Sequence, residues 1–206
     1  MLLELLFTNP ILYLMVAVSI LLALSIHEYS HAQAAYSLGD PTAKELGRLT
    51  VNPLAHLDPF GTLFLFLFGI GWGKPVPFNY LNLRNKKWGP ALIALAGPGS
   101  NFLMASVVGL SLRFFSFNSP GIVVFFSIFV WLNILLGIFN LMPIPPLDGS
   151  HLLFALLPRS FNQFKFSLLK NSFIWLIFVI FFMMYIGIPY IATPLFRIIT
   201  GIPRPI

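Results

Sequence analysis

The chain has 206 residues, of which 58% are hydrophobic and only 9% are charged, and its formal net charge is +6. So few charged side chains cannot cover a soluble globule of this size, which excludes an ordinary soluble domain and predicts an integral membrane protein. The sequence contains no cysteine. This excludes disulfides, thiolate metal ligands and a cysteine nucleophile, so any metal site must use histidine and carboxylate ligands.

Four apolar runs are long enough to cross a membrane as helices. A hydrocarbon core of about 30 Å requires roughly 20 apolar residues, and the predicted spans are residues 11–31, 90–113, 122–142 and 172–190. The first run lacks a basic leader and a small-residue cleavage pattern, so we expect a retained span rather than a signal peptide. The predicted fold class is an all-α polytopic membrane protein, with residues 1–206 forming a single domain.

A shorter apolar run lies between the first two spans. Residues 60–72, "FGTLFLFLFGIGW", are too few to cross the membrane and contain glycines, so we expect a re-entrant or interfacial hairpin. Proline-containing pieces with short alternation, such as "KPVPF", favour a small membrane-associated β element beside it. Residues 191–206 receive no predicted role.

Basic residues are distributed unequally between the two sides of these spans. Nine lysines and arginines lie in segments 32–89 and 143–171, and three lie on the opposite side. Because cytoplasmic loops are enriched in Lys and Arg, we expect the first of these sides to face the cytoplasm. Membrane orientation thus accounts for the net charge, and no nucleic-acid partner is expected.

The first predicted span ends in "HEYSH", residues 27–31. Residues four apart lie on one face of a helix, so His27 and His31 can direct ring nitrogens at one ion, with Glu28 beside it. This is the H-E-x-x-H arrangement, in which two histidines bind zinc and the glutamate acts as general base toward a water molecule. A catalytic zinc usually takes three protein ligands, so a third ligand must come from elsewhere in the chain.

Asp148 is the strongest candidate for that third ligand. It stands in "NLMPIPPLDGSH", after a span that returns to the side where the histidine pair lies. The prolines stop the helix, and Gly149 allows a sharp turn that can point the carboxylate back. Two carboxylates and two neutral imidazoles would balance the charge of a divalent ion near lipid. We exclude His151, because a fourth protein ligand would close the site to water.

These motifs resemble the site-2 proteases, zinc metalloproteases that cut substrates within or next to the membrane. The resemblance rests on "HEYSH", "AGPGSN" and "NLMPIPPLDG", and extends to "GDPTA", "GRLTVNPLAHLDPFGT" and "GWGKPVPFN" of compact bacterial and archaeal members. It implies one catalytic Zn²⁺ held by His27, His31 and Asp148, with Glu28 as the base. The implied partners are the lipid bilayer of a bacterial or archaeal cell and a membrane-spanning or membrane-anchored protein substrate, cut toward the cytoplasmic side.

The resemblance also draws attention to three further residues. It implies that Asn101 and Asn140 bind the substrate backbone or steady the oxyanion, and it favours a position near the cleft for His56. Alternatives stay open: the two asparagines can equally join helices through hydrogen bonds, as we expect of Asn133, and His56 can be an ordinary turn or interface histidine. The chain has no room for the PDZ domain of many larger members, and no CBS domain is expected.

Two functions of other classes are the alternatives to a protease. A metal-ion transporter or sensor would use the histidine pair to carry or detect an ion, but such proteins typically show paired repeats with broken helices, and no repeat is visible. A catalytically inactive membrane scaffold would not need Glu28. The sequence assigns no oligomeric state.

Overall fold

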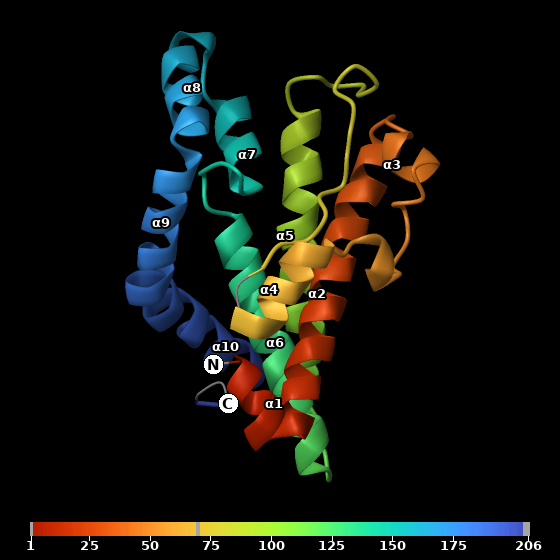
Figure 1. Cartoon of the computed structure of the whole chain (residues 1–206), viewed down its shortest axis with the longest axis vertical. Coiled ribbons are helices and arrows are strands. Elements are labelled where there is room, and N and C mark those ends of the chain that lie inside the picture. The colour runs from red at the N-terminus through yellow and green to blue at the C-terminus, as the bar shows by residue number, and fades with distance from the viewer. Residues whose placement is uncertain (1, 69–70, 204–206) are drawn as a thin grey trace.

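The computed structural model describes residues 2–68 and 71–203, and every regular element within them is a helix (Figure 1). Four helical stretches are long and apolar enough to cross a membrane: Pro10–Ser37, Gly89–Phe114, Pro120–Asn140 and Ser172–Thr200. The prediction of an all-α chain with four candidate spans is confirmed. The spans are α2, α5, α6 and a composite of α9 (Ser172–Phe182), a π-helical segment (Met183–Ala192) and α10 (Thr193–Thr200).

Short helices join and flank these spans. They are α1 (Leu2–Thr8), α3 (Thr42–Glu45), a 3-10 turn (Pro53–Ala55), α4 (Pro59–Phe68), α7 (Gly149–Leu156), a second 3-10 turn (Arg159–Phe161) and α8 (Asn162–Lys170). Helices α3, α7 and α8 gather at one end of the molecule, together with the irregular segment that leads into α5 (Figure 1). Most of the polar segments that connect the candidate spans therefore lie at that end.

Helix α2 is longer than predicted and places "HEYSH" inside the helix. It continues from the expected end at His31 to Ser37, because Ala32 and Ala35 are fully buried against neighbouring helices. The chain leaves the helical path at Gly39, whose φ of 104° is in the region that favours glycine. The predicted end of the helix was placed where the apolar run stops, at His31. The packing of small side chains extends the helix to Ser37.

The C-terminal segment, which had no predicted role, belongs to the core. Phe196 of α10 is fully buried, and its ring lies 5.8 Å from that of Trp131 on α6. Gly109 of α5 leaves space for Ile199, and Arg113 donates a hydrogen bond to the carbonyl of Ile198. Helix α10 thus closes the end of the bundle remote from α3 and α7.

The predicted β element is wrong. Among the described residues no strand occurs, and an isolated antiparallel bridge joins Leu57 to Gly73. Pro75 and Pro77 lack the backbone N–H groups that a ladder requires. The segment is instead held in an extended path by side chains of other elements, as described below.

The predicted hairpin at residues 60–72 begins as helix α4. Residues 69–70 lie outside the described residues, but Gly61 and Trp72 lie together: a Cβ on Gly61 would be 2.8 Å from Cδ1 of Trp72. The chain therefore comes back beside the start of α4. Whether this segment is re-entrant or interfacial stays a prediction.

Candidate metal centre

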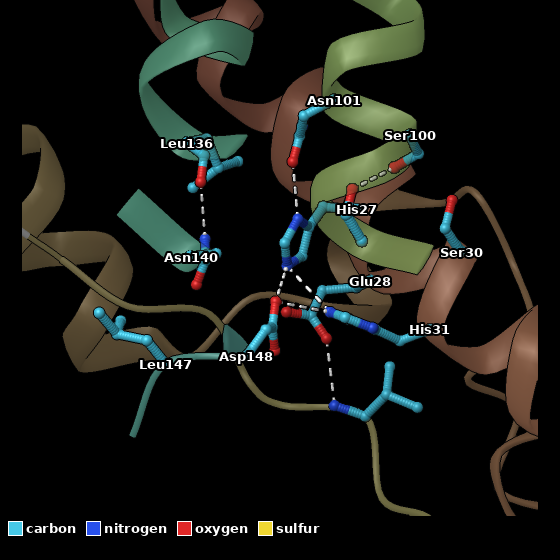
Figure 2. A network of polar contacts seen from close by, with 12 residues as sticks. His27, Glu28, Ser30, His31, Ser100, Asn101, Leu136, Asn140, Leu147 and Asp148 are labelled. Carbon is cyan, nitrogen blue, oxygen red and sulfur yellow. Dashed lines mark hydrogen bonds and ion pairs between the residues drawn. The ribbon is translucent and has the colours of Figure 1, made fainter. Parts of the chain in front are cut away.

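His27, His31 and Asp148, the three predicted metal ligands, come together although the histidines lie on α2 and Asp148 lies in the turn before α7 (Figure 2). The two Nε2 atoms of the histidines lie 3.0 Å apart. Oδ2 of Asp148 lies 3.1 Å from Nε2 of His27 and 3.2 Å from that of His31. Three ligand atoms in so small a triangle can face one metal ion.

The hydrogen bonds of the two imidazoles fix which ring nitrogen carries the hydrogen. Nδ1 of His27 lies 2.7 Å from Oδ1 of Asn101, and Nδ1 of His31 lies 2.7 Å from the carbonyl oxygen of Ile93. Both partners are acceptors, so each Nδ1 donates, and a neutral imidazole then presents a lone pair at Nε2. Two lone pairs and a carboxylate oxygen converge, which is repulsive without a cation and matches the donor set of zinc.

Asp148 supplies a charged oxygen to this triangle. The side chain is 21% exposed, and its buried Oδ2 atom has no hydrogen-bond donor among the described residues. Asp148 is therefore an anion that lacks a strong partner.

Helix α5 supports the histidine pair with a stripe of residues four apart. Ile93 and Asn101 provide the acceptors for the two Nδ1 atoms, and Gly97 lies between them on the same face. A Cβ on Gly97 would lie 2.5 Å from Cε1 of His31 and 2.7 Å from Cε1 of His27. The glycine of "AGPGSN" thus leaves the space that the two rings occupy.

Asn101 lies behind His27 in the helix interface. It is fully buried, and its amide group donates to Oδ1 of Asn133 at 2.9 Å and to the carbonyl of Ala23 at 3.3 Å. Asn133 in turn donates to the carbonyl of Phe129, so the network ties α5 to α6. Both amide hydrogens of Asn101 are engaged, which favours support of His27 over contact with substrate. The predicted oxyanion role stays a prediction.

Among the described residues, Asn140 and His56 form hydrogen bonds with groups other than the three converging side chains. Asn140 donates to the carbonyl of Leu136 in its own helix at 3.1 Å, and its amide oxygen points away from that carbonyl (Figure 2). Nε2 of His56, a buried residue, lies 2.7 Å from the carbonyl oxygen of Thr50, and the His56 carbonyl accepts from the backbone N–H of Lys74. Their predicted roles at the site stay predictions.

Gly149 brings Asp148 to the histidines. Asp148 immediately precedes α7, and a Cβ on Gly149 would lie 2.5 Å from the carbonyl carbon of Leu141 and 2.6 Å from the carbonyl oxygen of Met142. The backbone of α7 can therefore press against the end of α6. Gly149 does not have a positive φ, so close approach, rather than the predicted sharp turn, is the reason for glycine here.

A segment without helix or strand, residues 74–83, crosses over the site, and we call it the strap. The backbone N–H of Val76 donates to Oε2 of Glu28 at 3.1 Å (Figure 2). Arg48, which is buried, donates to the carbonyl of Lys74 at the start of the strap. Glu28 is thus held by the strap beside the three ligands, with its second carboxylate oxygen left for another partner.

Asp40 holds the other end of the strap. It is fully buried and accepts hydrogen bonds from the backbone of Asn79 (2.6 Å) and the side chains of Asn82 (2.9 Å) and Thr42 (2.6 Å). Burial acts to raise the pKa of the Asp40 carboxyl, but these hydrogen bonds outweigh it and lower the pKa. Asp40 was not among the residues predicted for the site. Its position before Pro-Thr and directly after Gly39 is typical of an Asp that caps local backbone, and was the available signal.

A cavity of about 170 Å³ opens beside the ligands. It is bounded by Glu28, by parts of the strap and by the ligand-bearing segments, the lining being Glu28, His31, Pro75, Val76, Phe78, Ile93, Ala94, Pro146, Asp148 and His151. Since a water molecule takes about 30 Å³ of liquid volume, the cavity has room for several waters or a peptide group. Burial lowers the pKa of His151, which lies at the edge and not among the converging ligand atoms.

The chain is similar in sequence to known proteins. "Putative zinc metalloprotease YwhC" of Bacillus subtilis is 39% identical over 149 residues, which cover 68% of this chain and 68% of YwhC. The model for peptidase family M50 matches residues 116–185, which contain Asp148. The chain belongs to peptidase family M50.

Other relatives of this M50 chain are longer. "Putative zinc metalloprotease Rip2" of Mycolicibacterium smegmatis is 32% identical over 66% of this chain and 55% of Rip2. "Zinc metalloprotease MJ0392" of Methanocaldococcus jannaschii is 26% identical over 76% of this chain and 38% of MJ0392. The chain thus matches about half or less of the length of these two relatives. No solved structure matches it.

Proposed function

We propose that this M50 chain is a zinc-dependent endopeptidase that hydrolyses peptide bonds of membrane-spanning or membrane-anchored proteins. The observation that carries the proposal is the convergence of two imidazole lone pairs and the Asp148 carboxylate on one point. Glu28, from the same turn of α2, stands beside that point without being one of the three converging groups. Three protein ligands and a separate carboxylate are the parts that a catalytic zinc site needs.

In this proposal His27, His31 and Asp148 hold the ion and Glu28 moves the protons. Bound zinc would supply a Lewis acid that acidifies water and polarises the scissile carbonyl. Glu28 accepts a proton from the attacking water through the carboxylate oxygen that Val76 does not engage, and then passes it to the leaving amine. Asn101 and Ile93 keep the imidazoles in the tautomer that leaves Nε2 free.

An apolar groove supports a substrate that lies in the membrane. It encloses about 440 Å³ between α2, α6 and the last composite helix, and its walls include Ala23 and Leu24, about one turn before His27. A membrane-spanning segment could approach the site along such a surface without exposing polar groups to lipid. Because helical carbonyls are engaged in i to i+4 hydrogen bonds, the substrate must unwind locally before attack.

The distribution of basic residues supports a site that faces the cytoplasm. Nine of the twelve lysines and arginines of the chain lie in segments 32–89 and 143–171, and these segments include α3, α7 and α8 at one end of the molecule (Figure 1). The metal centre lies on the part of α2 nearest that end and in the turn that leads into α7. We therefore place the protein in a cell membrane with its site open to cytoplasmic water.

The test is cleavage of a membrane-tethered substrate by the purified protein in vesicles. Glu28→Gln is expected to lower kcat by at least a hundredfold while the protein retains zinc, since the general base is lost but the ligands are intact. Glu45→Gln is the matched control, because Glu45 is exposed on α3 and belongs neither to the converging ligands nor to the lining of the cavity beside them. A chelator should abolish cleavage, and added zinc should restore it.

The same experiment separates the alternatives. Cleavage that survives both Glu28→Gln and the chelator would refute the zinc peptidase. Zinc bound with stoichiometry one, without cleavage of any tethered substrate but with zinc flux into the vesicles, would indicate a carrier instead.

A further inference from the structure

A second cavity, of about 460 Å³, lies at the end of the molecule that carries α7 and α8. Three of the six lysines of the chain line it, Lys86 and Lys87 from the segment before α5 and Lys165 from α8. Tyr80 and His151 form part of its wall, and no aspartate or glutamate is among its lining residues. We call it the basic pocket.

Within the described residues, no carboxylate forms an ion pair with the lysines of the basic pocket. Lys165 donates to the carbonyls of Phe154 and Leu157 at the end of α7, at 2.8 and 3.0 Å, which fixes its ammonium in the wall. The Lys87 ammonium lies 5.5 Å from the ring centre of Trp88. Such a concave cluster of cations attracts an anionic ligand.

The basic pocket adjoins the cavity at the metal centre. His151 lines both, and its ring centre lies 6.0 Å from that of Phe78, which lines the metal-site cavity. Phe78 in turn lies 5.0 Å from Tyr80 in the wall of the basic pocket. An extended peptide advances about 3.3 Å per residue, so residues some two to five positions from a bond at the metal centre would reach the lysines.

We propose that the basic pocket binds acidic side chains of the protein substrate, on the cytoplasmic side of the scissile bond, and thereby selects the substrate. The proposal rests on the proposed function of the metal centre. A peptide is favoured over a lipid headgroup because the pocket shares a wall with the site where the peptide would be cut. An acidic substrate segment would also complement a chain end that is strongly basic.

The experiment compares three tethered substrates that differ only at positions two to five on the cytoplasmic side, carrying acidic, neutral or lysine residues. Wild type should cleave the acidic substrate with a kcat/KM about three- to tenfold above the neutral one, mainly through KM, as expected for partly screened charge pairs. The preference should fall as salt shortens the Debye length to about 3 Å at 1 M. Vesicles with neutral lipid and with phosphatidylglycerol are tested in parallel.

Lys86→Glu combined with Lys87→Glu should reverse this order, so that the lysine substrate becomes the better one. Lys165 is left in place because it caps α7. The matched control, Lys44→Glu combined with Lys170→Glu, removes the same charge from exposed positions outside the pocket and should keep the wild-type order. A gain on the lysine substrate cannot result from misfolding.

Three outcomes would overturn the proposal. Equal cleavage of the three substrates by wild type would refute acidic selection and leave the peptidase standing. If the Lys86→Glu, Lys87→Glu variant lost activity equally on all three substrates, and only in phosphatidylglycerol vesicles, the pocket would be assigned to anionic lipid. Absence of cleavage of every substrate would refute the proposed function itself, and the inference with it.

Discussion

Gly97 provides the sharpest test of how the metal centre is built. In Gly97→Ala the new Cβ would lie 2.5 Å from Cε1 of His31 and 2.7 Å from Cε1 of His27. Ordinary carbon contacts begin near about 3.5 Å, so the rings would have to retreat by about 1 Å. They cannot simply rotate, because each Nδ1 is held at 2.7 Å by an oxygen of α5.

A shift of this size exceeds what a metal site tolerates. Ligand distances must hold within about 0.2 Å, and displaced supporting groups commonly cost 10- to 100-fold in metal affinity. We expect Gly97→Ala to bind zinc at least tenfold more weakly than wild type and to lose most of its activity. The measurement is zinc content by mass spectrometry after purification, followed by competition with a chelator of known affinity.

Gly99→Ala is the control from the same helix. A Cβ on Gly99 meets no atom within 4 Å, while both substitutions gain the same helix propensity, roughly 1 kcal/mol. Thermal unfolding in the presence of a chelator should therefore show that both variants fold. If Gly97→Ala held zinc as tightly as Gly99→Ala, the argument from close approach would be wrong.

Three further substitutions test other parts of the site. Asp148→Asn should keep the shape of the ligand but remove its charge, and zinc content should fall at least tenfold in the same chelator competition. Asn101→Leu should leave Nδ1 of His27 without its acceptor, weakening zinc binding by about 10- to 100-fold while Asn140→Leu leaves it unchanged. Asp40→Asn should destabilise the protein in detergent by about 2 kcal/mol at pH 7, because a charged acceptor is lost. Since the lowered pKa of Asp40 stabilises the folded state above the unfolded pKa of about 4, wild type should lose this advantage over the variant as the pH falls through that lowered pKa. Unfolding curves that stay equally far apart down to pH 3 would contradict the assignment.

The convergence of His27, His31 and Asp148 could be predicted from the sequence because each step needed only local geometry. Two histidines four apart face the same way on any helix, whatever surrounds it. Asp148 followed from counting crossings, since it must emerge on the side where the histidines lie. Neither step required knowledge of how a loop folds. Both remain valid although α2 ends six residues later than predicted.

The strap could not be predicted in this way. The hydrogen bond from Val76 to Glu28 joins residues 48 positions apart, and Asp40 reaches Asn79 across 39 positions. No periodic pattern encodes such contacts. The short alternation in "KPVPF" predicts an extended chain, which is correct, but it does not distinguish a strand with a backbone partner from a segment held by side chains. Pro75 and Pro77 lack the backbone N–H groups that a β ladder requires, so the segment forms no strand.

Two glycines explain why the metal centre requires more than its ligands. Gly97 lets α5 approach α2 until its oxygens reach both imidazoles, and Gly149 lets α7 approach α6 until Asp148 reaches the same point. Neither has a positive φ, so it is the missing side chain that matters, not unusual backbone. Within a membrane, where apolar burial gives little force between helices, close packing of small residues is the main means of fixing their distance. The glycines therefore set the spacing of the site, and the histidines and Asp148 set its chemistry.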